Sequence, residues 1–185
     1  HNIKININEN WFYRMVTPDN FYEIISSGGI ISERHLKLIN KIKDYGEIGW
    51  NGIDYISLSK RVNVNKSSYR YFSYGYYSLI IQTNNAIKTH YLNVPLFIAK
   101  LPIPIRFSPW QDEYQVKDFL PLSNIIGIKL PETNNISIIE QEKQLDDFIS
   151  IMKRTGFFVP FIDLENNKII PSIKVKQYLS NRNGI

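Results

Sequence analysis

Apolar residues in this chain recur mostly at every second position, in short runs that are typical of β-strands. The clearest run covers residues 54–59, where Ile56 and Leu58 alternate with Ser57 and Ser59. Side chains of an extended strand point alternately to its two faces, so the pattern predicts a strand with an apolar face and a serine face. Similar signals predict strands at residues 11–16, 77–82, 96–100, 114–116, 125–130, 157–162 and 168–173.

Three other segments carry apolar residues at helical spacing. The first follows the capping residue Thr17 and spans residues 18–27, and the second spans residues 32–43. The strongest helix signal covers residues 140–154, where one face carries Leu145, Phe148, Ile149 and Met152. Helices followed mainly by strands, with no internal repeat and no linker, predict a single α+β domain over residues 1–185.

Composition narrows the chemistry that this domain can support. The sequence has 185 residues, 43% of them hydrophobic, which is enough for a substantial core. It contains no Cys and only three His, so thiol catalysis and Cys-based metal sites are excluded, and we expect no metal site. The net charge of +5 favours contact with polyanions, although the basic residues form no run. The longest apolar runs are strand-sized, so we expect a protein without a transmembrane segment.

Three polar features within or beside the predicted strands are the candidates for chemistry. They are Tyr13-Arg14 before the first helix, Ser57-Leu58-Ser59 on a strand, and Gln111-Asp112-Glu113 at the head of another strand. Taken singly, each is typical of a solvated surface group. Their order along the chain is what suggests a common site.

In that order, the three features resemble the mono-ADP-ribosyltransferase family of toxins and effectors, in its Arg-Ser-Glu form. The opening residues 13–29 and residues 113–122 are also similar to the DNA-targeting branch of that family. The resemblance implies a split β-sandwich of two small, mainly antiparallel sheets with flanking helices. It also implies NAD as the substrate, and a macromolecular acceptor for its ADP-ribose. Because the central segment lacks the aromatic-rich motif of the DNA-targeting branch, a protein acceptor is favoured over a nucleic acid.

The resemblance also assigns roles to residues. Glu113 is the expected catalytic carboxylate, Ser57 positions it, and Gln111 faces the acceptor. Arg14 is expected to hold the dinucleotide, with Tyr13 and Ser59 beside it. The stacking partner of the nicotinamide is expected among four aromatic residues, with Tyr71 and Tyr74 foremost: Tyr71, Phe72, Tyr74 and Tyr76.

Several alternatives stay open at this point. In a rival alignment, Glu113-Tyr114-Gln115 fills the motif and leaves Gln115 in the catalytic position. The same fold could also serve as a non-catalytic basic module that binds protein or nucleic acid, or as a hydrolase or RNA 2′-phosphotransferase-like enzyme. A toxin of this kind is expected to have an antitoxin or regulatory partner. It would act in the cytoplasm, or be secreted and act in the cytosol of a target cell.

Overall fold

The computed structural model describes residues 10–32, 55–60, 77–88, 113–132 and 138–182. In chain order the elements are β1 (Trp11–Val16), α1 (Pro18–Ser26), β2 (Gly29–Ile31), β3 (Tyr55–Ser59), β4 (Tyr77–Gln82), β5 (Ile87–Lys88), β6 (Glu113–Lys117), β7 (Phe119–Pro121), η6 (Leu122–Asn124), β8 (Ile125–Lys129), α4 (Ile138–Thr155), β9 (Phe161–Asp163), β10 (Lys168–Ile170) and α5 (Val175–Arg182). The strand predicted at 96–100 lies outside the described residues, as does the helix predicted at 32–43 except for Ser32, which is not helical.

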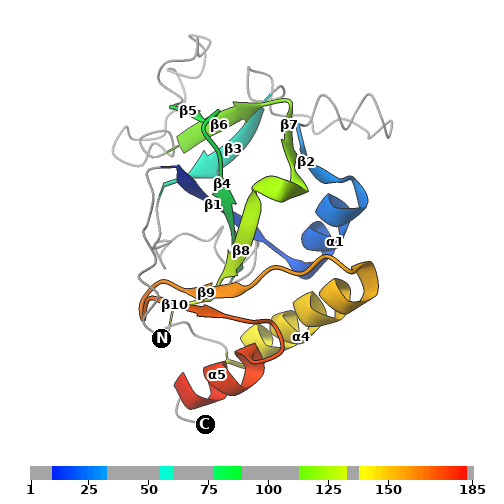
Figure 1. Cartoon of the computed structure of the whole chain (residues 1–185), viewed down its shortest axis with the longest axis vertical. Coiled ribbons are helices and arrows are strands. Elements are labelled where there is room, and N and C mark those ends of the chain that lie inside the picture. Colours follow the sequence, from blue (N-terminus) through cyan, green and yellow to red (C-terminus); the bar gives the residue numbers. More distant parts are fainter. Residues whose placement is uncertain (1–9, 33–54, 61–76, 89–112, 133–137, 183–185) are drawn as a thin grey trace, which may run out of the picture.

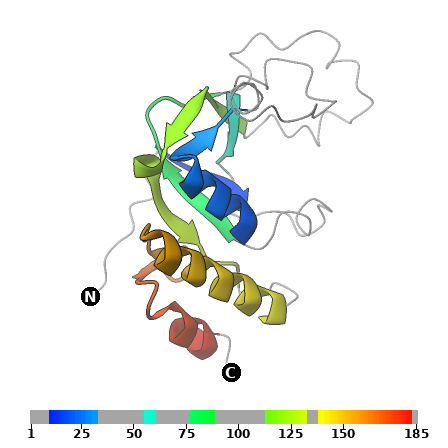
Figure 2. The same ribbon diagram turned by 90° about the vertical axis from the view of Figure 1, so that its right-hand side faces the viewer.

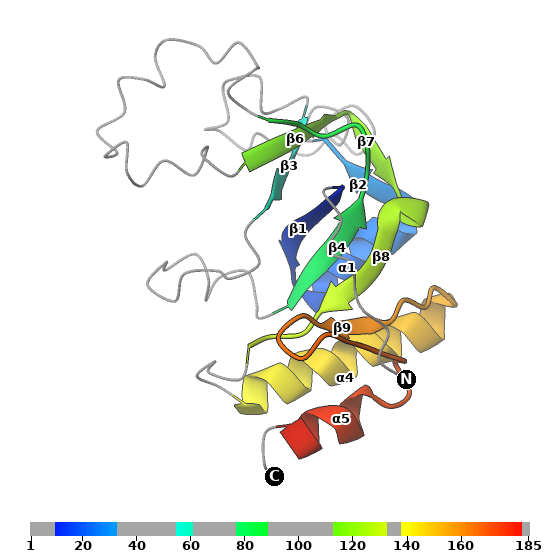
Figure 3. The same cartoon turned by 60° about the vertical axis from the view of Figure 1, so that its left-hand side comes forward.

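Ten described strands form a large and a small sheet (Figure 1). The large sheet has the order β10-β9-β8-β4-β1-β3-β6-β5, and β2 pairs with β7 in the small one. Every pair is antiparallel except β8 with β9. Strands β3, β5 and β6 lie at one end of the molecule, whereas α4 and α5 lie at the other (Figures 1 and 3). The predicted α+β class with mainly antiparallel strands is confirmed.

The large sheet is almost divided in two between β1 and β3. Strand β1 pairs with β4 at six positions, from Trp11 to Val16, and β3 pairs with β6 at five. By contrast, among the described residues β1 and β3 are in register at one pair only, Tyr13 with Ser59. The strand order is therefore continuous, but the β3–β6–β5 part joins the rest of the sheet through a very short ladder.

Helix α1 begins and ends as its sequence predicts. The hydroxyl oxygen of Thr17 accepts a hydrogen bond from the Asn20 backbone N–H at 3.2 Å, and Pro18 occupies the first turn. After the helix, Gly28 adopts φ +76°, a left-handed conformation that glycine takes without steric cost. Figure 2 shows α1 and α4 on the same side of the strands, where they cover one face.

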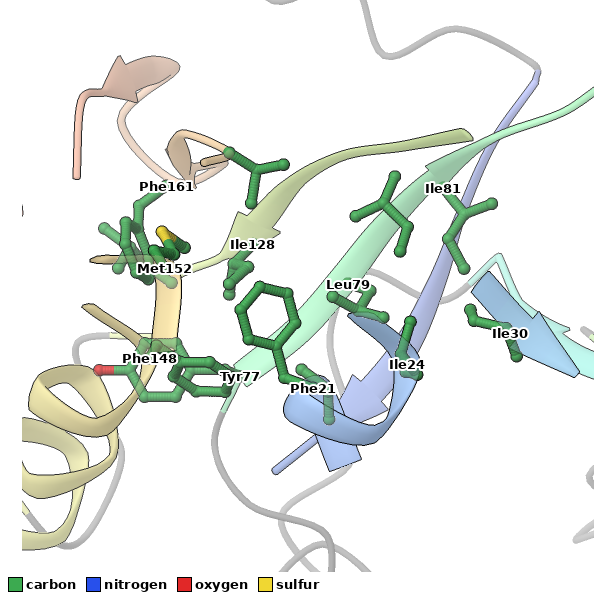
Figure 4. Close-up of a cluster of buried hydrophobic side chains, with 14 of the residues drawn as sticks. Phe21, Ile24, Ile30, Tyr77, Leu79, Ile81, Ile128, Phe148, Met152 and Phe161 are labelled. Carbon is green, nitrogen blue, oxygen red and sulfur yellow. The ribbon is translucent and has the colours of Figure 1, made fainter. Parts of the chain in front are cut away.

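The main hydrophobic core lies between the large sheet and these two helices (Figure 4). The Phe148 ring of α4 packs edge-on against Phe21 of α1 and Tyr77 of β4, with ring centroids 5.5 and 5.2 Å apart. The Tyr77 hydroxyl donates a 2.8 Å hydrogen bond to the Gln141 carbonyl, which satisfies its one polar group. Burial raises the pKa of Tyr77, so it stays neutral. On the opposite face, Tyr13, Ile80 and Ile162 form a smaller cluster.

Five described elements were not predicted from the sequence: β2, β5, β7, η6 and α5. Strands β2 and β7 have three residues each, and β7 ends at Pro121, which the sequence alone marks as a break. Helix α5 buries only Val175 and Leu179, so its periodic signal is weak. The helix predicted at 140–154 is confirmed as α4, and α5 adds a second late helix that the predicted order of helices first and then mainly strands did not include. No helix in the described part of the chain is long and apolar enough to cross a membrane.

The chain leaves the large sheet and enters the small one at a single residue. Asp118, between β6 and β7, has φ 64°, and its carbonyl accepts a 2.8 Å hydrogen bond from the Ser32 backbone N–H. Aspartate is among the few residues other than glycine that adopt this conformation readily. The turn therefore directs β7 towards β2 and fixes β6 relative to the small sheet.

Replacing Gly29 with Ala is expected to destabilise the fold by about 1–3 kcal/mol, because the added methyl group overpacks the small sheet. A Cβ at this position would collide with the Leu120 carbonyl oxygen and lie 2.8 Å from the Phe119 ring. Urea unfolding measures the change. Gly28→Asn is the control, since a Cβ there meets nothing within 4 Å and asparagine tolerates the left-handed backbone. An equal loss in both variants would contradict the packing explanation.

Candidate active site

Arg14 and Ser57 are 43 positions apart in sequence and in direct contact in the structure. The Arg14 Nη1 atom donates a hydrogen bond to the Ser57 carbonyl oxygen at 2.8 Å. This bond joins β1 to β3 next to the register pair of Tyr13 with Ser59. Arg14 is partly exposed and the Ser57 side chain is exposed, so both lie where a ligand can reach them.

Three other predicted residues lie in one row across three adjacent strands. Ser59 of β3 is in register with Tyr13 of β1 on one side and with Glu113 of β6 on the other. Residues directly opposite each other in antiparallel strands have Cβ atoms roughly 4.5–5.5 Å apart. The backbone therefore brings Tyr13, Ser59 and Glu113 together at the point where the large sheet divides.

The register changes the expected partnership between the serines and Glu113. Ser57 is in register with Gln115, and Ser59 with Glu113. Diagonal neighbours across strands are roughly 7–8 Å apart, so Ser59 is the nearer serine to Glu113. Ser57 instead contributes its carbonyl oxygen to Arg14. In the backbone register, Ser59 is therefore the serine opposite Glu113, and Ser57 lies two pairs further along the ladder.

The alternation predicted for β3 is present. Ile56 and Leu58 are buried in the main core, while Ser57 is exposed and Ser59 is half-buried. The apolar side chains hold the strand against the core, because burying them removes apolar surface from water. The two serines consequently remain on the face away from the main core.

Tyr13 is a packing residue as well as a neighbour of Ser59. Its ring is 4% exposed and contacts the cluster with Ile80 and Ile162. Its hydroxyl is buried and has no hydrogen-bond partner among the described residues. Burial raises the pKa of Tyr13, so the phenol is neutral at physiological pH.

Lys60 is a residue near this site that the sequence motifs did not indicate. Its Nζ atom donates a hydrogen bond to the Trp11 carbonyl oxygen at 2.8 Å and lies 4.1 Å from the centre of the Phe12 ring. The Phe12 ring in turn packs against Tyr114, with centroids 5.1 Å apart. The only available signal was position, since Lys60 directly follows Ser59.

Several predicted site residues lie outside the described part of the chain. These are the acceptor-facing Gln111 and the aromatic candidates for stacking: Tyr71, Phe72, Tyr74 and Tyr76. For Glu113, the structure describes the backbone only, through its place in β6. Gln115, the alternative catalytic residue of the rival alignment, is 2% exposed.

A second polar cluster lies at the other end of the molecule. The Asp163 carboxylate accepts hydrogen bonds from Asn166 Nδ2 at 3.0 Å, Tyr178 Oη at 2.6 Å and Arg182 Nη1 at 3.2 Å. Arg182 also donates through Nη2 to the Pro131 carbonyl oxygen at 2.8 Å. The Arg182 and Asp163 side chains are 6% and 2% exposed, so this is a buried ion pair that attaches α5 to β9.

The pKa values in this second cluster follow from its contacts. Burial acts to raise the pKa of Asp163, but the hydrogen bonds from Asn166 and Tyr178 and the charge of Arg182 outweigh it and hold the pKa below its ordinary value. Burial and the hydrogen bond to Asp163 raise the pKa of Tyr178 to about 12. All these groups already bind one another, so the cluster serves stability. Within the described ranges, no group of His, Asp and Glu could hold a metal ion.

The described helices and strands make this an α+β protein with a divided, mainly antiparallel sheet. Among solved structures, the chain is similar to DarT from Thermus sp. 2.9 in complex with carba-NAD+. The two share 12% sequence identity and a TM-score of 0.46, over 80% of this chain and 90% of that chain. No protein-family model matches the sequence, and no curated protein matches it significantly.

Proposed function

We propose that this protein is a mono-ADP-ribosyltransferase that cleaves NAD and transfers ADP-ribose to a macromolecular acceptor. The observation that carries the proposal is the meeting of three distant motifs at one place in the sheet. Arg14 contacts Ser57, and Ser59 is in register with Glu113. These contacts support the proposal because they bring the three motifs to adjacent strands.

The residues suit the chemistry of breaking the bond between nicotinamide and ribose. That bond breaks with positive charge developing at the ribose carbon, while the bonding electron pair leaves with nicotinamide. A carboxylate fixed beside the ribose stabilises this charge, as carboxylates do in glycosidases. Glu113 fills this role, with Ser59 beside it. A nucleophile of the acceptor then bonds to the ribose carbon and loses its proton.

Arg14 is the residue proposed to hold the dinucleotide. A planar guanidinium with several donors matches the oxygens of a pyrophosphate or a ribose. One of its nitrogen atoms is fixed by the Ser57 carbonyl, which restricts the orientation of the whole group. Such a group binds NAD before the reaction as well as during it, so it contributes mainly to affinity.

The experiment that tests the function is the release of nicotinamide from NAD by the purified chain, alone and with candidate acceptors. One arm supplies a protein extract and the other supplies DNA and RNA, each with NAD labelled in the ADP-ribose part. We expect label on the protein fraction, since the sequence lacks the aromatic-rich segment of the DNA-targeting branch. Label on nucleic acid would support the proposed transferase activity but show that its acceptor is a nucleic acid. Absence of NAD consumption in every arm would favour the non-catalytic binding module.

Replacing Arg14 with Lys is expected to raise the KM for NAD roughly 10- to 100-fold, the range that corresponds to losing about 1.5–3 kcal/mol of hydrogen bonding to charged groups. Lysine keeps the charge but lacks the planar set of donors. Steady-state kinetics and calorimetric titration of NAD measure the effect. Lys153→Arg on α4 is the control, because it makes the reverse exchange at an exposed position away from the motif residues. An unchanged KM in Arg14→Lys would remove Arg14 from the proposed binding site.

A further inference from the structure

The junction between β1 and β3 is completed by two cations placed symmetrically about one residue pair. Arg14 directly follows Tyr13 and donates to the carbonyl of Ser57, two residues before Ser59. Lys60 directly follows Ser59 and donates to the carbonyl of Trp11, two residues before Tyr13. Both bonds are 2.8 Å long and join the two strands on either side of the pair.

These two bonds act where the β-ladder is shortest. Strand β1 is held to β4 at six register positions, whereas β1 and β3 share one in the part of the chain that the structure describes. Glu113 belongs to β6, which is paired with β3 at five positions. The position of Glu113 relative to Arg14 therefore depends on how firmly β3 is held against β1.

Arg14 and Lys60 differ in what else they do. Arg14 is the proposed ligand of NAD, so its guanidinium has a second role besides joining β1 to β3. The Lys60 ammonium lies over the Phe12 ring at 4.1 Å, and Phe12 is 4% exposed. A cation over an aromatic face is attracted by its negative charge density, so Phe12 and the Trp11 carbonyl both fix this ammonium.

We propose that Lys60 is a positioning residue that holds the β3–β6 part of the sheet, and with it Glu113, at the correct distance from the dinucleotide bound on β1. This inference rests on the proposed transferase function. Catalysis is sensitive to such placement, since a misplacement of about 1 Å can cost roughly 100-fold in rate. Lys60 would thus contribute to turnover without touching the substrate.

The test compares Lys60→Met, Lys60→Arg and the wild-type chain by steady-state NAD turnover, well below their unfolding temperatures. Methionine keeps an unbranched apolar side chain but removes the donor and the charge. We expect kcat to fall roughly 10- to 100-fold in Lys60→Met. The KM should change less than about twofold, because Arg14 stays on β1. Lys60→Arg should restore kcat, since a guanidinium can also donate to Trp11 and lie over Phe12. Lys117→Met, an exposed lysine on β6, is the matched control and should match wild type.

Amide hydrogen exchange gives a second readout that does not need activity. Lys60→Met should speed exchange in residues 55–59 and leave residues 78–81 of β4 unchanged. Should Lys60→Met fail to fold, Lys60→Gln replaces it, and the same loss of kcat with rescue by Lys60→Arg is expected.

Two results would overturn the inference. A raised KM with unchanged kcat would make Lys60 a direct ligand of NAD. Kinetics and exchange equal to those of Lys117→Met would show that the Lys60 bond does not hold the junction. If the wild-type chain consumes no NAD, the proposed function fails, while the exchange measurement still decides whether Lys60 holds β3.

Discussion

Replacing Glu113 with Gln is expected to lower kcat for NAD cleavage roughly 100- to 1000-fold, which corresponds to about 2.7–4 kcal/mol of lost transition-state stabilisation. Glutamine has nearly the same shape but no negative charge to offset the positive charge that develops at the ribose carbon. Binding of NAD should change little, because the positive charge at the ribose carbon develops only as the bond to nicotinamide breaks. Nicotinamide release and calorimetric titration of NAD measure the two effects separately.

The control for this prediction is Glu142→Gln, which removes an exposed carboxylate from α4 at the other end of the molecule. It should leave both kcat and NAD binding unchanged. Gln115→Glu tests the rival alignment, since it places a carboxylate opposite Ser57. If Glu113→Gln transferred ADP-ribose at the wild-type rate, Glu113 would be a solvated surface residue and the binding-module interpretation would take its place.

Replacing Asp163 with Asn is expected to reduce the free energy of unfolding by about 3–5 kcal/mol at neutral pH, because it leaves the buried Arg182 charge without its counterion. This is a large part of the roughly 5–15 kcal/mol that stabilises a typical domain. Tyr178→Phe removes one hydrogen bond from the same carboxylate and should cost less, about 1.5–3 kcal/mol. Urea unfolding followed by circular dichroism measures both.

Because of the Asp163–Arg182 ion pair, we expect the free energy of unfolding to depend on pH in the acid range. Because the pKa of Asp163 is lower in the folded chain than in the unfolded chain, its contribution is fully present above about pH 4 and is lost as the pH falls through the folded value. The difference between wild type and Asp163→Asn should therefore narrow in acid. Asp146→Asn, which breaks an exposed ion pair with Lys176, is the control and should alter the unfolding midpoint little at any pH. If the difference in unfolding free energy between wild type and Asp163→Asn stayed constant across the acid range, it would contradict the lowered pKa of Asp163.

The sequence predicted those parts of the fold whose signals are local. The Thr17 cap and Pro18 define the start of α1, and the alternation of Ile56 and Leu58 with serines defines β3. The C-terminal helix α5 was missed because its stability comes from Tyr178 and Arg182, which contact Asp163 fifteen and nineteen positions away. Local periodicity carries no trace of such contacts.

In the candidate site, too, only the features with local sequence signals could be predicted. The motifs selected Arg14 and Ser57 as site residues, and these two residues are in contact. The sequence could not show which serine lies opposite Glu113, because that depends on the register between β3 and β6. It also gave no reason to select Lys60, whose partners Trp11 and Phe12 belong to a strand 49 and 48 positions earlier.

The left-handed residue Asp118 limits how this protein can vary. Strand β6 is in register with β3 through Glu113, and β7 is in register with β2 through Leu120, which is 2% exposed. One residue separates the two strands, so an insertion or deletion there would shift one ladder and turn its side chains to the wrong face. Distant relatives should therefore keep a fixed interval between a carboxylate and a buried apolar residue. That spacing offers a better search pattern than overall identity.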